Sequence, residues 1–215
     1  MRKQTLFITS IVLLAIILYS FKTPLIDGAN KNLNTNLDEK IERKVDSVLA
    51  LMRLNEKIGQ LVQYSGKWNA TGPSASNADK HKLNKLKNGE VGSMLNITSV
   101  ASIRETQKMV MDHSRLKIPL IFGYDVIHGY KTIFPIPLGE SASWDLEIIK
   151  KTAAIAAKET AASGIQWTFA PMIDISRDAR WGRVMEGAGE DVYLNTVIGV
   201  ARVQGFQGDD LSLPT

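Results

Sequence analysis

The sequence predicts an α/β fold built on a parallel sheet, and three observations support this prediction. Helical and strand periods alternate along the chain, in the order helices and then β-α-β-α-β-α. The strand candidates are apolar on both faces, which is typical of parallel strands covered by helices. The 215 residues, 44% of them hydrophobic, suffice to bury one sizeable core. A doubly wound sheet and a (β/α)8 barrel both fit this order.

The first part of the folded region is expected to be helical. Residues 37–52 repeat apolar side chains at helical spacing, which gives the helix one apolar face made of Leu37, Ile41, Val45, Val48 and Met52. A short second helix is expected over residues 56–63, with Asn55 as its cap. Residues 65–80 are rich in glycine, serine, asparagine and alanine, and are expected to form a loop.

Three strands and three helices are expected to alternate over the rest of the chain. The strands are short apolar runs at 91–97, 118–126 and 165–175, and the helices follow them at 100–116, 145–164 and 191–208. Asp145 is expected to cap the second of these helices and Gly164 to end it.

Composition excludes several classes of function. The formal net charge is only +4 and no basic run stands outside the N-terminus, which gives no electrostatic case for binding nucleic acid. The chain has no cysteine, and this excludes disulfides, thiolate catalysis, cysteine–zinc sites and a lipoprotein anchor. His81 and His113 are expected on helix surfaces, at a spacing that does not suggest a metal site. Neither a metal nor an organic cofactor is implied.

The N-terminus has the pattern of an export signal. Residues 1–22 begin with the two basic residues Arg2 and Lys3, and an apolar run follows from Leu6 to Leu18, shorter than the roughly 20 residues that a membrane span prefers. No small-residue cleavage site follows, so a signal peptide and an uncleaved membrane anchor both fit. Either one predicts an exported protein, periplasmic or extracellular. Residues 23–36 are expected as a polar linker and 37–215 as the folded part.

Two polar clusters follow the second and third expected strands, in "GYDVIHG" and in "PMIDISRDARWGRVMEGAGED". Both candidate architectures place ligand chemistry at the carboxyl ends of parallel strands, so a site is expected there. Carboxylates and arginines beside an aromatic suit a sugar, because they form charge-assisted hydrogen bonds with its hydroxyl groups. Cleavage of a glycosidic bond needs two carboxyl groups.

Each candidate also has a purely structural interpretation. Asp125 could cap the loop that follows it, His128 could bond within a turn, and Asp174 could accept from nearby backbone amides. The charged residues of the second cluster could form an ion-pair network that holds a long loop: Arg177, Asp178, Arg180, Arg183 and Glu186. Glu190 and Asp191 open the last expected helix, where capping explains them.

Four segments resemble the N-terminal barrel of glycoside hydrolase family 3: "RLNEKIGQL", "IPLIFGYDVIHGYKTIFPIPLG", "WTFAPMIDISRDARWGRVMEGAGED" and "ARVQGFQG". The resemblance runs from about Leu37 to the last residues, and its most specific part is D-x-x-H-G followed by R-D-x-R-W-G-R and E-G-x-G-E-D. It is closest to the β-glucosidase branch. It implies an α/β fold that is a partial (β/α)8 barrel, the N-terminal portion only, because a whole barrel takes about 250 residues. Ala188 departs from the aromatic residue usual at that position, which bears on loop packing or on the pocket wall.

The resemblance implies an enzyme that releases terminal β-D-glucose by a retaining mechanism. Asp125 matches the carboxylate that holds hydroxyls of the sugar at the cleaved end, and Arg183 matches the arginine that reaches that same sugar. Lys131 stands where relatives often carry an arginine beside the pocket, so it is expected to bind substrate as well. Arg177, Arg180 and Glu186 are expected to hold the loop in shape.

The family's catalytic residues are not matched in this chain. In the family a Lys-His pair follows on the next strand, and the nucleophilic aspartate and the acid/base come later still. We therefore expect these residues to be a fragment of a larger hydrolase that does not cleave β-glucosides alone. Two alternatives stay open: a truncated, non-catalytic module for carbohydrate binding or assembly, and a β-xyloside as the substrate. The expected partner is a β-linked glucoside or oligosaccharide, with membrane contact only through the N-terminal segment.

Overall fold

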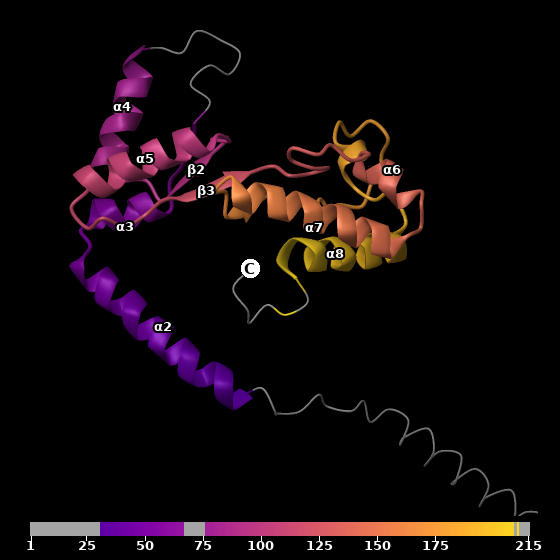
Figure 1. Cartoon of the computed structure of the whole chain (residues 1–215), viewed down its shortest axis with the longest axis horizontal. Coiled ribbons are helices and arrows are strands. Elements are labelled where there is room, and N and C mark those ends of the chain that lie inside the picture. The colour runs from indigo at the N-terminus through magenta and orange to yellow at the C-terminus, as the bar shows by residue number, and fades with distance from the viewer. Residues whose placement is uncertain (1–30, 67–75, 209, 211–215) are drawn as a thin grey trace, which may run out of the picture. The chain divides into compact units, whose positions relative to one another are not determined.

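A computed structural model describes residues 31–66, 76–208 and 210 (Figure 1). The chain divides into two compact units, Met1–Leu51 and Met52–Thr215. The first unit contributes helix α2 (Lys31–Leu51), and the second contains the sheet and the candidate site. Among the described residues, no helix has both the length and the apolar character needed to cross a membrane.

Helix α2 begins earlier than the sequence predicted. Residues 31–36, expected as the end of the polar linker, are helical in their backbone. No glycine or proline stands between Gly28 and the predicted start at Leu37, so nothing in that stretch interrupts a helix. The predicted export signal over 1–22 and the rest of the linker lie outside the described residues.

Four short parallel strands form the sheet of the second unit, in the order β1-β2-β3-β4. They are β1 (Gln63–Ser65), β2 (Ser93–Leu95), β3 (Ile121–Tyr124) and β4 (Trp167–Thr168). In the register of the sheet Met94 lies opposite Phe122, and Gly123 opposite Trp167. A doubly wound sheet reverses its strand order at one point, whereas these strands follow one another in chain order. The predicted fold class, α/β with the N-terminal portion of a (β/α)8 barrel, is confirmed.

Helices connect the strands and cover the sheet. They are α4 (Ser76–Lys87), α5 (Val100–His113), α6 (Pro137–Ser141) and α7 (Leu146–Ala162), and α8 (Val192–Gln207) follows β4. His81 and His113 are exposed on α4 and α5, as predicted. The main core lies between the sheet and its first covering helices, and its buried members include Leu86, Met94, Ile103, Val110 and Phe122.

The start of the second unit differs from the prediction in two ways. Helix α3 (Leu54–Gln60) ends before residue 63, and β1 follows where the prediction continued the helix. The side chains of β1 alternate between exposed and half-buried, a period of two that a three-residue segment barely reveals. The predicted loop over 65–80 contains the first turn of α4, and its residues 67–75 lie outside the described part.

The predicted cap of α3 was wrong. Arg53 occupies the N-cap position, and its backbone N–H donates to the Glu56 carboxylate at 2.7 Å. The Glu56 carboxylate, three residues after the N-cap, therefore accepts a hydrogen bond from a backbone N–H at the start of the helix, and no short polar cap residue is needed. Asn55 instead donates from Nδ2 to Glu90 Oε1 at 2.8 Å, which ties α3 to the segment before β2.

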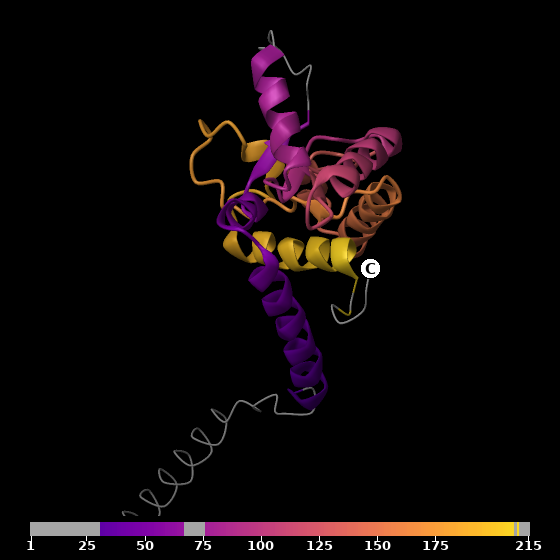
Figure 2. The ribbon, with the colours of Figure 1, turned by 90° about the vertical axis from the view of Figure 1, so that its left-hand side faces the viewer.

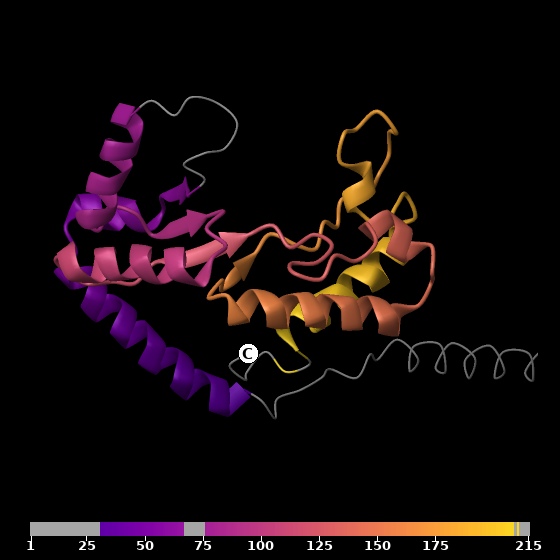
Figure 3. The ribbon, with the colours of Figure 1, turned by 45° about the horizontal axis from the view of Figure 1, so that its top comes forward.

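Helices α7 and α8 pack closely against each other (Figures 1 and 3). A Cβ added at Gly205 of α8 would lie 2.6 Å from Ala153 Cβ of α7, and closer still to the carbonyl oxygen of Lys150. Only a residue without a side chain fits such a crossing. Figure 2 shows α8 along its whole length.

The ends of these two helices match the prediction. Asp145 caps α7 by accepting from Ile148 N at 3.0 Å, and Gly164 follows its end with φ at 88°. Asp191 caps α8 by accepting from Leu194 N at 2.6 Å, as the capping interpretation required.

Candidate active site

The carboxyl ends of β3 and β4 carry the two predicted polar clusters. Asp125 directly follows β3 and is exposed. After β4 the chain passes through the cis peptide between Ala170 and Pro171 and reaches Asp174, which is also exposed. Residues 174–191 then form a long loop that includes the 3-10 turn η1 (Val184–Glu186) and contacts α6 (Figure 3).

Backbone contacts give this long loop its path. The Ser176 N–H donates to the carbonyl of Gly189 at 3.1 Å, which joins the two ends of the loop. Asn195, buried on α8, donates from Nδ2 to the carbonyl of Asp174 at 3.0 Å. A Cβ at Gly187 would lie 3.3 Å from that same carbonyl oxygen, so the loop turns back closely on its own start.

Ala188 lies beneath the loop. Its side chain is 5% exposed and packs in a cluster with Ile149 and Ile198, while Leu194 lies against the cluster. The departure from the family's usual aromatic residue therefore concerns the packing between the loop and helices α7 and α8.

Arg183 is the centre of a charged cluster. Its Nη2 lies 2.6 Å from Glu186 Oε2, and its Nε lies 3.1 Å from both carboxylate oxygens. The hydrogen bond to Glu186 is the main cause that raises the pKa of the Arg183 guanidinium, and the charges of Asp125 and Asp174 add to it. Arg183 likewise lowers the pKa of Glu186, and His128 acts in the same direction. Residues from both strand ends thus share one electrostatic cluster.

Within the described part of the chain, two carboxylates of this cluster interact with Arg183 through their charge alone. Over the described ranges, the Asp125 and Asp174 side chains accept no hydrogen bond. The structure therefore gives no support to the interpretations of Asp125 as a cap or of Asp174 as an acceptor from nearby amides. His128 does bond within its turn, because its Nδ1 lies 3.0 Å from the carbonyl oxygen of Phe134.

Three predicted site residues lie apart from this cluster. Lys131 is exposed, with its Nζ 5.0 Å from the centre of the Tyr130 ring. Arg180 pairs with Asp178 within one exposed turn, at 2.5 Å. Arg177 is exposed and makes no ion pair with any residue that the structure describes. The support of the loop by Arg177 and Arg180 stays a prediction.

The loop after β3 is anchored by a residue that the sequence analysis missed. Glu159 of α7 accepts from the backbone N–H groups of Lys131 and Thr132, both at 2.8 Å, and from Thr132 Oγ1 at 2.6 Å. The hydrogen bonds from Thr132 are the main cause that lowers the pKa of the Glu159 carboxyl. An acidic residue in the last turn of a helix, where the helix dipole disfavours it, was the available signal.

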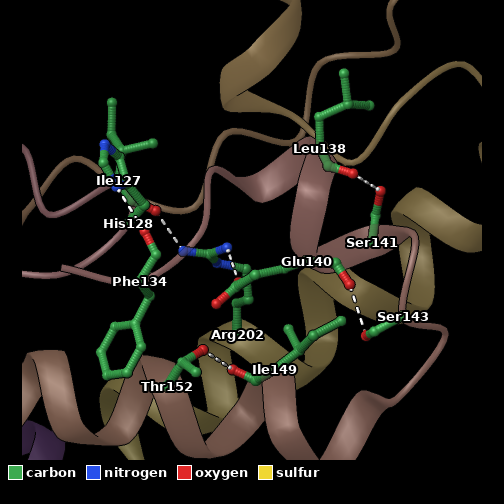
Figure 4. Close-up of polar contacts among 10 residues, drawn as sticks. All are labelled: Ile127, His128, Phe134, Leu138, Glu140, Ser141, Ser143, Ile149, Thr152 and Arg202. Atoms are coloured by element: carbon green, nitrogen blue, oxygen red, sulfur yellow. Dashed lines mark hydrogen bonds and ion pairs between the residues drawn. The ribbon is translucent and has the colours of Figure 1, made fainter.

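A buried ion pair was missed as well. Arg202 of α8 donates from Nη1 to Glu140 Oε2 of α6 at 2.8 Å (Figure 4). Arg202 is the single charged residue in the sequence of α8, and an isolated charge within an apolar helix signals a buried partner.

A hollow among the described residues lies elsewhere. It has a volume of about 560 Å³ and lies between α7, α8 and β4, lined by residues such as Thr160, Trp167 and Phe206. Neither Asp125 nor Arg183 lines it. Its walls offer few charged groups, so the polar cluster at the strand ends is the better candidate site. No three histidine or carboxylate side chains of the described part gather as a metal site would need.

Residues 53–213 match the model of the glycosyl hydrolase family 3 N terminal domain. The chain belongs to this family. A periplasmic β-glucosidase of Salmonella typhimurium is 43% identical over 164 residues, which cover 76% of this chain and 20% of that protein. The structure of a β-glucosidase of Listeria innocua in complex with glucose superposes with a TM-score of 0.68 and is 41% identical in sequence. The superposition covers 78% of this chain and 24% of the Listeria innocua chain.

A member with another named activity is also similar. A β-xylosidase of Formosa agariphila is 29% identical over 197 residues, covering 91% of this chain and 22% of that protein. The chain thus spans between a fifth and a quarter of the length of these three relatives.

Proposed function

We propose that this chain supplies part of the sugar pocket of a β-glucosidase. The observation that carries the proposal is the cluster at the ends of β3 and β4, where the charge of the exposed Asp125 carboxylate acts on the Arg183 guanidinium. The glycosidase class comes from the family. The choice of a β-glucoside is supported by the relatives from Salmonella typhimurium and Listeria innocua.

The chemistry assigned to the two residues is hydrogen bonding to one sugar ring. Asp125 accepts from ring hydroxyl groups, and Arg183 donates to a hydroxyl oxygen while Glu186 fixes its guanidinium. Such charge-assisted hydrogen bonds are roughly twice as strong as neutral ones. Lys131 is proposed as a further contact at the rim of the pocket.

We assign the bond-breaking steps to groups beyond these residues. A retaining glycosidase uses a nucleophilic carboxylate and a second carboxyl group as acid and base. Asp125 and Asp174 are proposed to bind sugar rather than to fill these roles. The chain covers only about a fifth of its Salmonella relative, which supports its being one part of a longer hydrolase. The N-terminal pattern and the periplasmic relative support export.

The test is the hydrolysis of an aryl β-glucoside by the complete gene product. Asp125→Ala is expected to lower kcat/KM roughly 10- to 100-fold, the range expected for a lost hydrogen bond to a charged group. Asp112→Ala is the matched control, because Asp112 is an exposed carboxylate on α5 that pairs only with Lys108 within the described part. A normal kcat/KM in Asp125→Ala would refute the assignment.

Two further measurements address the alternatives. The 215 residues alone are expected to show no turnover, and clear hydrolysis by them would refute the assignment of the catalytic groups to another part of the protein. The Formosa agariphila relative makes a β-xyloside the second candidate substrate. Comparing kcat/KM for the aryl β-glucoside and the aryl β-xyloside decides between them. Binding of glucose without cleavage of either would favour the non-catalytic module.

A further inference from the structure

The buried pair of Arg202 and Glu140 connects three parts of the fold. The two side chains are 5% and 6% exposed and come from α8 and α6. Arg202 also donates from Nη2 to the carbonyl oxygen of Ile127, in the loop that follows β3. Figure 4 shows the guanidinium between this carbonyl and the Glu140 carboxylate.

The pair is poorly explained as a device for stability. Burial lowers the pKa of the Arg202 guanidinium, and the charge of Glu140 opposes this effect. Arg202 Nε and Glu140 Oε1 are buried with no hydrogen-bond partner among the described residues. Buried ion pairs often give no more stability than apolar side chains of the same volume, and unsatisfied polar atoms make this one less favourable still.

The contact with Ile127 has a clearer consequence. The Ile127 carbonyl belongs to the peptide group that leads into His128, and Ile127 is two residues from Asp125. His128 continues the connection, because its carbonyl accepts from Phe134 N at 2.8 Å and its ring contacts the Phe134 carbonyl. Val126, between Asp125 and Ile127, is fully buried. The orientation of the Ile127 peptide therefore determines how the chain leaves β3 and where Asp125 and His128 lie.

We propose that Arg202, held by Glu140, is a positioning residue of the sugar site that fixes the loop carrying Asp125 and His128. It acts through the backbone of that loop and makes no contact with the sugar. The inference rests on the proposed function for its catalytic consequence. Its structural half, that Arg202 holds the loop, is tested independently of any sugar.

The experiment compares three variants of the complete gene product. The double variant Arg202→Met with Glu140→Leu removes both charges and keeps apolar volume, so it is expected to fold with little change in its melting temperature. Arg202→Lys keeps the charge and loses the planar fork that reaches two acceptors at once. Lys108→Met is the control, because it breaks an ion pair that is exposed on α5.

Two quantities are measured on each variant. The first is amide hydrogen exchange, by mass spectrometry, of the loop 125–136 and of helix α7 as the reference. The double variant is expected to exchange roughly tenfold faster in the loop, as befits a lost hydrogen bond from a charged donor, with α7 unchanged. The second is kcat/KM for an aryl β-glucoside, expected to fall roughly 10- to 100-fold, since small misplacements at a site have such effects. For Arg202→Lys, both the exchange rate of the loop and kcat/KM are expected to lie between those of wild type and those of the double variant.

The outcomes separate the two claims. Faster exchange confined to the loop, together with lower kcat/KM, supports the proposal. Unchanged exchange in the loop overturns it, and so does an equal rise in the loop and in α7, which would mark general destabilisation. If the wild-type protein neither binds nor cleaves a β-glucoside, the proposed function fails, and exchange still decides whether Arg202 holds the loop.

Discussion

Replacing Gly205 with alanine tests the close packing of α8 on α7. The new Cβ would lie 2.6 Å from Ala153 Cβ, whereas carbon atoms in contact prefer about 3.5–4.0 Å. Helix α8 would therefore have to move away by about 1 Å. Alanine gains about 1 kcal/mol over glycine in helix propensity, and overpacking costs up to about 3 kcal/mol when backbone must move. The difference predicts a net loss of about 2 kcal/mol in the free energy of unfolding.

Urea denaturation and thermal melting of the purified protein measure this loss. A loss of about 2 kcal/mol corresponds to a melting temperature lower by roughly 4–8 °C for a protein of this size. Gly139→Ala on α6 is the control, because its Cβ would make only ordinary contacts of 3.6 and 3.8 Å. If Gly205→Ala were as stable as wild type, the description of the α7–α8 crossing would be wrong.

Three further predictions concern the loops and their anchors. The lowered pKa of Glu159 means that its support of the loop after β3 is present above the ordinary value of 4.5 and is lost as the pH falls through the lowered pKa. Amide exchange of that loop, corrected for intrinsic rates, should rise only as the pH falls through the lowered pKa of Glu159. Glu159→Gln should remove this dependence on pH. Asp191→Ala should lower the free energy of unfolding by about 1 kcal/mol in urea melts, with Asp191→Asn close to wild type. Arg183→Lys should lower kcat/KM roughly tenfold with an unchanged urea midpoint, because lysine cannot engage Glu186 through two nitrogens at once.

The parts of the fold that could be predicted are those with a long, regular pattern. Helices α7 and α8 have caps at Asp145 and Asp191 and many apolar residues, and both were expected within a few residues of their observed bounds. The strand expected over 165–175 is only Trp167–Thr168 in the structure. Strand length depends on hydrogen bonding to a neighbour, and in the described part β4 pairs only with β3. An apolar sequence run contains no information about how far its partner extends.

The site was predictable to a similar degree. Asp125 and Arg183 could be expected at the same edge of the sheet because parallel strands deliver their carboxyl ends to one edge. The partners of Glu159 could not be predicted, because they are backbone N–H groups in another segment and a backbone group has no signature in a sequence. Glu140 could not be identified as the partner of Arg202 for a different reason, because only the three-dimensional packing brings α6 beside that side chain.

The two anchors of the loop after β3 share a property with consequences for how such a site diversifies. Arg202 binds the carbonyl of Ile127, and Glu159 binds the amides of Lys131 and Thr132, so both engage mainly the main chain. The path of the loop is thereby encoded in helices α7 and α8, outside the loop itself. Exposed side chains such as Lys131 can then be exchanged by mutation, in nature or in the laboratory, while the backbone keeps its course. Under the proposed function, a library that varies Lys131 and preserves Glu159, Arg202 and Glu140 is expected to sample new sugar preferences on an unchanged backbone.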